Sequence, residues 1–360
     1  MGWQGIFPYS EDMSALGDRR CHGGGIVVWE DRMGRRDERF LLFGTRPDRY
    51  DWRGAGWFAV LYAGAFAVAA VVAPPVYAGV LWLAEGAGEG TLLHYLAGKR
   101  LDVYVDRVRL LFALGATLWL IGYCRLWGRF GFAWDRHGAA DFAVWLGVGA
   151  AMLAGMAGMQ WMFLGPEWAE GAGPERLARI AAGALATALV VGFLEEAIFR
   201  GMVFRMFYTA LPPASAVVLS ALVFAAVHFK GVSFDAGAEL HWWTGFAVAW
   251  ESFLAVVYTF DFFPFLNLFL AGVALNLLFL RTGGLMACVG LHAGWVVVRQ
   301  TWAGSVAFED GPGAVWLGGR GVVDGVVPVV ILLLLIGWLF YGIYSRKVEG
   351  ARPRSGGSSR

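Results

Sequence analysis

The sequence has few charged residues for its length. Asp, Glu, Lys and Arg make up 16% of its 360 residues, whereas hydrophobic residues make up 58%. Ordinary soluble domains contain about 25% charged and about 45–50% apolar residues. Because so few charges cannot cover the surface of a soluble protein of this size, lipid must replace water over much of that surface. The composition therefore excludes a soluble globular protein and predicts an all-α polytopic membrane protein.

Cysteine content and net charge are also low. The chain has three cysteines, Cys21, Cys124 and Cys288, and a formal net charge of +1. An odd, scattered set of cysteines without CxxC spacing excludes a disulfide framework. A net charge so close to zero gives no basic surface, so we expect no nucleic-acid partner.

Several common catalytic and nucleotide-binding motifs are missing. The sequence contains no HExxH zinc motif, no GxSxG nucleophile motif and no Walker-type phosphate-binding loop. These absences exclude the usual zinc-helix proteases, the α/β-hydrolases and the P-loop nucleotidases.

The polarity of the sequence divides it into three parts. Residues 1–54 carry nine arginines and nine acidic residues and predict a polar cytoplasmic N-terminal arm. Residues 55–345 hold the apolar stretches and predict a transmembrane domain. Residues 346–360 are basic and of low complexity, and they predict a disordered tail.

Apolar stretches near the length of about 20 residues that a bilayer requires recur along this domain. We predict about eight spans, at 56–83, 108–123, 141–164, 180–208, 213–229, 253–280, 285–303 and 325–344. The segment 230–252 mixes tryptophan with charged residues and predicts an interfacial or re-entrant segment. An even number of spans places both termini on one side of the membrane.

Basic residues predict which side that is. They occur in the tail and after the second span, at Arg125, Arg129, Arg136, Arg346, Lys347, Arg352, Arg354 and Arg360. The first loop, on the opposite side, also holds Lys99, Arg100, Arg107 and Arg109. The positive-inside rule predicts cytoplasmic termini. The abundance of Gly, Ala and Arg suggests a GC-rich bacterial genome, and we therefore expect a bacterial inner membrane.

Two adjacent glutamates lie in the middle of the fourth predicted span. Glu196 and Arg200 are spaced i,i+4 on one helix face and can form a neutralising pair. Glu195 points about 100° away and has no cation at i+3 or i+4. Ionisable residues inside a span are functional candidates, and a carboxylate without a cation can act as a general base. The alternative to a catalytic role is that Glu196 and Arg200 form a structural ion pair that holds helices together.

Two histidines lie in later spans. Phe224 and His228 share a helix face, where a lone histidine is usually a packed residue. If the fourth and fifth helices are antiparallel, Glu195 lies about 20 Å and His228 about 24 Å from the turn between them, so their depths are similar. His292 in the seventh span would lie at about 12 Å, which is shallower. Asn276 in the sixth span could hydrogen-bond between helices and more often has a structural role.

These residues follow a known arrangement. The segment 195–200, EEAIFR, resembles the EExxxR motif of the CPBP family of intramembrane proteases (CAAX protease and bacteriocin-processing, also called Abi or Rce1-like). The segment 224–228, FAAVH, resembles its FxxxH motif, and 269–295 is similar to its last motif, which ends in HxxxN. The resemblance covers about 180–300. It implies an eight-helix membrane fold and a glutamic endopeptidase that hydrolyses peptide bonds inside a membrane cavity.

The resemblance also implies roles for single residues. Glu195 would activate water, and Glu196 and Arg200 would complete the first motif. His228 and His292 would orient water or stabilise the oxyanion. Where the family has asparagine four residues after the last histidine, this sequence has Val296. An oxyanion donor would then have to come from another residue, such as Asn276.

Several functions and one alternative chemistry stay open. A carboxylate mechanism needs no cofactor, although Glu195, His228 and His292 are also a possible zinc set. The chain could be an endopeptidase acting on membrane-associated peptides or proteins. It could instead be a non-catalytic immunity or scaffold protein of the same fold. A proton-coupled transporter is the third possibility, against which the lack of paired broken spans argues.

Overall fold

The computed structural model describes the chain in several stretches. These are residues 52–123, 131–132, 135–171, 173–229, 240–241, 243–308, 311, 313–319 and 321–351. Nearly all of the predicted N-terminal arm and most of the predicted tail lie outside them, as do residues 230–239 and 242 of the predicted interfacial segment, whose last part is the beginning of a helix at Thr244.

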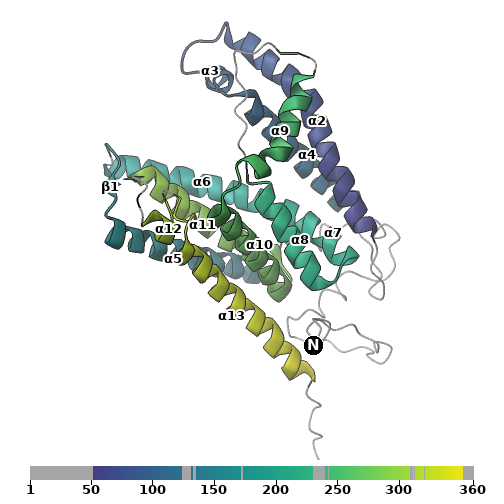
Figure 1. The fold of residues 1–360 in the computed structure, drawn as a ribbon, viewed down its shortest axis with the longest axis vertical. Helices are drawn as coiled ribbons and strands as arrows, with labels where there is room; N and C mark the ends of the chain where they lie inside the picture. Colours follow the sequence, from purple (N-terminus) through teal and green to yellow (C-terminus); the bar gives the residue numbers. More distant parts are fainter. Residues whose placement is uncertain are drawn as a thin grey trace, which may run out of the picture.

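The described chain is almost entirely helical, as the composition predicted (Figure 1). The helices are α2 (Arg53–Ala84), α3 (Leu92–Ala97), α4 (Leu101–Tyr123), α5 (Arg136–Leu164), α6 (Pro174–Ile198), the π-helical turn η3 (Phe199–Val203), α7 (Phe204–Ala210), α8 (Pro213–Ala226), α9 (Thr244–Tyr258), α10 (Phe262–Thr282), α11 (Leu285–Ser305), α12 (Ala314–Leu317) and α13 (Val326–Ala351). Two short strands, β1 (Glu167–Trp168) and β2 (Val306–Ala307), pair antiparallel beside the turn between α5 and α6.

Five helices in the described chain are long and apolar enough to cross a membrane. They are α2, α5, the continuous run Pro174–Ala210, α10 and the Val326–Ser345 part of α13. By the same measure α4 and α11 are not apolar enough, and α8 with 14 residues is too short. The chain is therefore a polytopic helical membrane protein, and the number of eight spans stays a prediction.

Two of the predicted boundaries were wrong. The apolar stretch 253–280 is not one span, because α9 ends at Tyr258 and α10 begins at Phe262. Asp261 takes an extended conformation between them, a local break that overall hydropathy does not reveal. At the other end of the chain, α13 continues to Ala351, beyond the expected start of the tail at 346.

Local signals explain where several helices begin and end. Asp135 caps α5 by accepting a hydrogen bond from the Gly138 amide at 2.9 Å. Gly165 ends the same helix in the left-handed conformation, with φ of 57°. Gly283 ends α10 in the same way, with φ of 68°. These glycines supply a backbone conformation that other residues rarely adopt.

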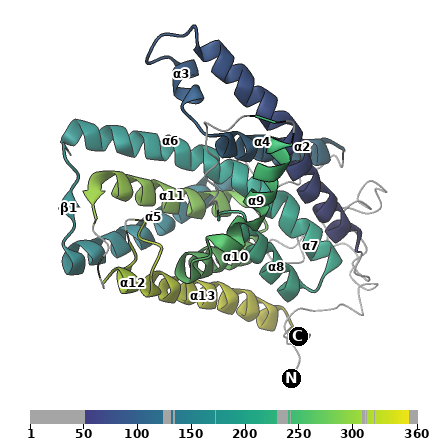
Figure 2. The same cartoon turned by 45° about the horizontal axis from the view of Figure 1, so that its top comes forward.

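The helices form two groups. Helices α2, α3, α4 and α9 lie together at the top of Figure 1, where α2, α4 and α9 share a small apolar core of their own. The remaining long helices surround a larger core, and α5, α6 and α11 lie alongside one another in Figure 2. The contacts of α2 with α7 and of α4 with α6 join the two groups.

Glycines bring α11 very close to its neighbours. A Cβ atom on Gly290 would lie 2.3 Å from the Phe142 carbonyl oxygen of α5. A Cβ atom on Gly294 would lie 2.4 Å from the Leu146 carbonyl oxygen. On the other side, Gly192 of α6 faces Val289 of α11, with 3.5 Å between its Cβ position and the carbonyl oxygen. The glycines at the crossing of α5 and α11 let the two backbones approach closely, whereas the contact of α6 with α11 at Gly192 is an ordinary van der Waals contact.

Candidate active site

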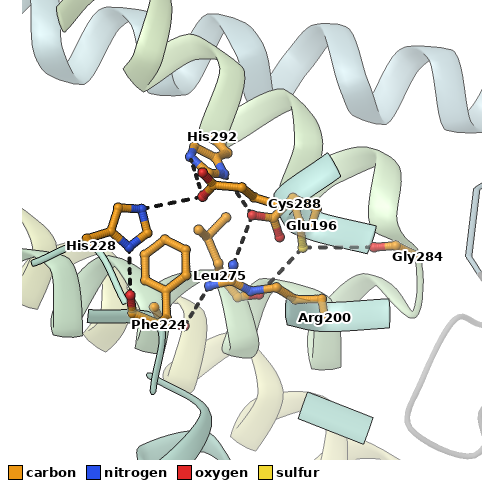
Figure 3. Close-up of polar contacts among 10 residues, drawn as sticks. Glu196, Arg200, Phe224, His228, Leu275, Gly284, Cys288 and His292 are labelled. Carbon is orange, nitrogen blue, oxygen red and sulfur yellow. Dashed lines mark hydrogen bonds and ion pairs between the residues drawn. The ribbon is translucent and has the colours of Figure 1, made fainter. Parts of the chain in front are cut away.

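The three sequence motifs meet in one place, at the end of α6, the end of α8 and the middle of α11 (Figure 3). The side chains of Glu196, Arg200, His228 and His292 point toward one another there. The sequence predicted that His292 would lie less deep in the membrane than His228, but in the fold both imidazoles lie beside Glu195. In the fold α6 and α11 are in contact at Gly192, one turn before Glu196, so Glu196 and His292 lie at the same level.

Glu196 and Arg200 form the predicted ion pair. Arg200 Nη1 donates to Glu196 Oε1 at 2.9 Å, and both side chains are essentially fully buried. Arg200 Nη2 also donates to the Gly272 carbonyl oxygen of α10 at 3.3 Å. The guanidinium carbon lies 4.7 Å from the centre of the Phe224 ring, a cation–π distance. Arg200 therefore links α6, α8 and α10.

His292 lies between the two glutamates. Its Nδ1 is 2.8 Å from Glu196 Oε1 and its Nε2 is 3.9 Å from Glu195 Oε2. The side chain is nearly buried, at 9% exposed. One imidazole thus contacts the buried pair with one nitrogen and faces the second carboxylate with the other.

His228 approaches Glu195 from the opposite side. Its Nε2 lies 3.4 Å from Glu195 Oε2, and its Nδ1 lies 2.6 Å from the Phe224 carbonyl oxygen. His228 is not on the fifth helix as expected, because α8 ends at Ala226 and His228 follows in the turn. The bond from its own backbone amide to the Ala225 carbonyl oxygen, at 3.1 Å, belongs to this turn.

The hydrogen bonds of the two imidazoles fix their neutral tautomers. The Phe224 carbonyl oxygen can only accept, so Nδ1 of His228 carries the proton. Glu196, paired with Arg200, is an ionised acceptor, so Nδ1 of His292 also carries the proton. In the neutral form both Nε2 atoms are then acceptors. Three acceptors, these two nitrogens and Glu195 Oε2, face one another, which is a suitable place for a proton donor such as water.

Glu195 and His228 are the members of the cluster that reach open space. Their side chains are 23% and 28% exposed, whereas that of Glu196 is fully buried. Glu195 and His228 line a cavity of about 230 Å³ between α2, α4, α6 and α8. The catalytic candidates therefore adjoin a space in which a substrate can bind.

The oxyanion donor expected near His292 is absent from this position. Val296 lies one helical turn after His292 and carries no donor on its side chain. Asn276 is completely buried in α10, and its Nδ2 donates to the Val217 carbonyl oxygen at 3.1 Å. This bond joins α10 to α8, so the amide of Asn276 has a structural partner.

The spacing of the cluster can be compared with that of zinc ligands. Ligand atoms about 2.1 Å from a tetrahedral zinc lie about 3.4 Å apart. The 3.4 Å between Glu195 and His228 fits this value, whereas the 3.9 Å between Glu195 and His292 is longer. Within the described stretches, no group of three His, Cys, Asp or Glu side chains is arranged to hold a metal ion. The geometry therefore does not favour zinc.

Sequence reasoning missed the wall of the cavity that faces Glu195. Arg107 and Arg109 were counted as loop charges, but both lie on α4 and line this cavity, together with Tyr62 of α2. In the sequence, both residues directly precede an apolar stretch. That position is as typical of a loop before a helix as of the helix itself. Their location is decided by the packing of α4 against α2 and α6.

Comparison with known proteins supports the motif assignment. Residues 178–298 match the family model described as type II CAAX prenyl endopeptidase, Rce1-like. No curated protein and no solved structure is significantly similar to this chain. The matched segment runs from α6 to α11 and contains all three motifs. The segment 178–298 is thus similar to the Rce1-like family of CAAX-type endopeptidases, as its motifs predicted.

Proposed function

We propose that the chain is an intramembrane endopeptidase in which Glu195 activates a water molecule. The observation that carries this proposal is the convergence of Glu195 Oε2 with Nε2 of His228 and Nε2 of His292 beside the cavity. A general base must lie within hydrogen-bonding reach of the proton it removes, directly or through water. Membrane-associated peptides or proteins are the proposed substrates.

The proton follows a closed path in this reaction. A water molecule among the three acceptors donates one O–H bond to Glu195 and the other to an imidazole Nε2. As the water oxygen bonds to the substrate carbonyl carbon, Glu195 takes the first proton and the carbonyl electron pair moves to its oxygen. When the C–N bond breaks, Glu195 returns that proton to the leaving amine. The products are a carboxyl group and an amine.

Stabilisation of the oxyanion is the weaker part of this site. A tetrahedral intermediate requires a hydrogen-bond donor near its oxygen. Neutral His228 and His292 cannot donate from Nε2, because their protons are on Nδ1. Val296 has no donor to offer. We propose that one imidazole stays neutral and accepts from the water, while the other, protonated at both Nδ1 and Nε2, supplies the donor.

Replacement of Glu195 tests the proposal. Glu195→Gln keeps the shape of the side chain and removes the base, so we expect a folded protein whose cleavage rate falls by about 10²–10⁴-fold or more. Glu175→Gln, at an exposed position on the same helix, is the matched control and should keep the wild-type rate. Membrane proteomes of cells with the wild-type or variant protein identify substrates, and mass spectrometry of reconstituted peptides gives the rates. Wild-type cleavage by Glu195→Gln would contradict the proposal.

Two alternatives have distinct outcomes in the same assays. The missing donor at Val296 favours a non-catalytic membrane immunity or scaffold protein, for which neither wild type nor variant would cleave any peptide. A zinc enzyme would lose activity with a chelator and would carry one zinc ion per chain. The glutamate mechanism predicts the same rate with and without the chelator.

A further inference from the structure

We propose that the hydroxyl group of Tyr62 on α2 donates a hydrogen bond to the oxyanion, in addition to the protonated imidazole. This inference deepens the proposed peptidase function and rests on it. It gives the site a donor in place of the one that is missing at Val296. Tyr62 lies outside the segment 178–298 that matches the family model.

Tyr62 belongs to the wall of the cavity beside Glu195. Helix α2 contributes five lining residues at helical spacing, Phe58, Leu61, Tyr62, Ala65 and Phe66. Tyr62 is the central member of this face, and Glu195 lies on the α6 face that lines the same cavity. The cavity of about 230 Å³ is below the range of about 300–1,000 Å³ typical of small-ligand sites. Groups on its different walls can therefore contact the same peptide unit.

Tyr62 and Glu195 also lie at similar levels along their helices. At the start of α2, the Cβ position of Gly54 is 2.3 Å from the Met206 carbonyl oxygen of α7. From this contact, eight residues of α2 lead to Tyr62, or about 12 Å. Eleven residues lead back from Met206 to Glu195, or about 16.5 Å. The difference is shorter than a tyrosine side chain, so its hydroxyl group can reach the level of the proposed base.

Three aromatic rings hold the ring of Tyr62 in place. It stacks on Phe58 with 5.5 Å between the ring centres, and it meets the edge of Phe66 at 5.2 Å. The ring of Phe253 in α9 lies 6.5 Å away. These are favourable distances for aromatic pairs. A donor with a fixed ring is preorganised, as stabilisation of a developing charge requires.

The hydroxyl group of Tyr62 is available for a ligand. Within the described stretches, no hydrogen bond engages this group, and its oxygen is not enclosed in the protein interior. The residue as a whole is half-buried. Because a tyrosine O–H usually has a partner when its ring is packed, an unpaired one on a cavity wall indicates a place where a substrate oxygen can accept.

The arginines of the same wall are less suited to this role. Arg109 Nη1 lies 3.5 Å from Asp106 Oδ1, and the guanidinium carbon lies 4.3 Å from the centre of the Phe66 ring. Its charge therefore already has a counter-ion, and Arg107 is exposed. The neutral O–H group of Tyr62 needs no counter-ion. It strengthens its hydrogen bond only when charge develops on the substrate oxygen, which is the condition for catalysis.

This role adds no proton transfer to the reaction. As the water oxygen bonds to the carbonyl carbon, the carbonyl electron pair moves to its oxygen, and the Tyr62 hydroxyl group donates a hydrogen bond to it. The phenol keeps its proton throughout. Glu195 still carries the proton of the water to the leaving amine, so the products are unchanged.

Removal of the hydroxyl group tests the inference. Tyr62→Phe keeps the ring and its aromatic contacts. The substrate is a peptide identified by the comparison of membrane proteomes, and cleavage is measured with the full chain in lipid nanodiscs. We expect kcat to fall by about 10²-fold with little change in KM, because the hydrogen bond stabilises the transition state more than the bound substrate.

The matched control removes a hydroxyl group from the same helix outside the cavity. Tyr77 is 2% exposed, and its ring centre lies 5.1 Å from that of Tyr104. Tyr77→Phe should keep the wild-type kcat. Melting temperatures of both variants show whether they are folded, and Tyr62→Leu takes the place of Tyr62→Phe if the latter is not.

A thioamide at the scissile bond gives a readout that a merely structural role of Tyr62 would not change. Sulfur in place of the carbonyl oxygen is a weaker hydrogen-bond acceptor. We expect the wild type to cleave the thioamide about 10²-fold more slowly than the amide. In Tyr62→Phe this difference should be much smaller, because the two changes remove the same hydrogen bond and their effects are not additive.

Three results would overturn the inference. They are a wild-type kcat in Tyr62→Phe, an equal loss in Tyr77→Phe, and a thioamide effect of the same size in Tyr62→Phe and the wild type. Cleavage that depends on Glu195 but not on Tyr62 would leave the proposed function intact and remove only this inference. Absence of cleavage by the wild type would overturn both.

Discussion

Adjacent glutamates in this chain have different surroundings. Glu196 is fully buried and contacts Arg200 and His292, whereas Glu195 is partly exposed and faces two imidazole nitrogens and the cavity. Burial with an ion pair makes Glu196 important for stability. Contact with open space makes Glu195 suited to proton transfer.

Replacing Glu196 should lower stability together with activity. Glu196→Gln leaves Arg200 buried without its carboxylate, and breaking a buried ion pair typically destabilises a protein by about 3–5 kcal/mol. The double variant Glu196→Gln with Arg200→Met removes both charges and should recover stability more than activity. Melting temperature in detergent and cleavage rate are measured on the same preparations. A stable but inactive Glu196→Gln beside an active Glu195→Gln would mean that the two roles are reversed.

Position 296 offers a gain-of-function prediction. Val296→Asn places an amide donor one turn after His292, where a donor is otherwise missing. Removal of an oxyanion donor typically slows enzymes by about 10²–10³-fold, so an added donor in an unoptimised geometry should raise kcat by up to about 10-fold. Val296→Leu is the control for size and should not raise it. An unchanged kcat in Val296→Asn would show that the oxyanion does not lie near this residue.

At the scale of the helices, close packing of α5 with α11 decides where His292 lies. The Cβ position of Gly290 is 2.3 Å from a backbone oxygen of α5, so even alanine there must push the two helices apart. The π-helical turn η3 begins at Phe199, directly after the end of the neighbouring α6 and three residues after Glu196. Such turns are rare and frequently occur at functional sites. The geometry of the site therefore depends on a few backbone approaches.

Two glycine-to-alanine variants test this dependence. Gly290→Ala should destabilise the protein by about 1–3 kcal/mol through overpacking and should slow cleavage by displacing His292. Gly147→Ala, on α5, is the control because a Cβ atom there meets no atom within 4 Å. It should be neutral or stabilise the helix, since alanine is the better helix former. Equal melting temperatures for the two variants would contradict this account of the crossing.

At the scale of the whole molecule, the start of α2 and the end of α13 lie on the same side of the helix bundle. The start of α2 lies at α7, where the Cβ position of Gly54 is 2.3 Å from the Met206 carbonyl oxygen. The ring of Phe204, also in α7, lies 5.9 Å from that of Phe279 near the end of α10. The start of α2, helix α7 and the end of α10 therefore lie in one region; the first two are seen on the right of Figure 2.

The end of α13 belongs to the same region. The Cβ position of Gly342 lies 2.8 Å from the guanidinium of Arg281, which is next to the end of α10. An even number of crossings would join two ends on one side, and the basic residues predict that this side is cytoplasmic. Reporter fusions at Arg53 and Ser345 should both show cytoplasmic activity. Periplasmic activity at either position would contradict the predicted topology.

Much of this protein is determined by its sequence alone. Composition determined the membrane environment and the helical class, because both depend on total apolar content and on the need to satisfy backbone groups within a span. Local spacing determined the pair of Glu196 and Arg200, because i,i+4 neighbours meet on any regular helix. Three motifs in order determined the family of the central segment.

Only the tertiary structure decided how distant helices meet. Depth counted along the chain placed His292 about 8 Å away from the level of Glu195, whereas in the fold its Nε2 lies 3.9 Å from that carboxylate. The break before α10, the turn that carries His228 and the position of Arg109 in the cavity wall were likewise not predicted. The break and the turn are local backbone features that hydropathy does not reveal. The positions of His292 and Arg109 depend on crossings between helices far apart in sequence, such as the close backbone approach of α11 to α5 at Gly290 and Gly294.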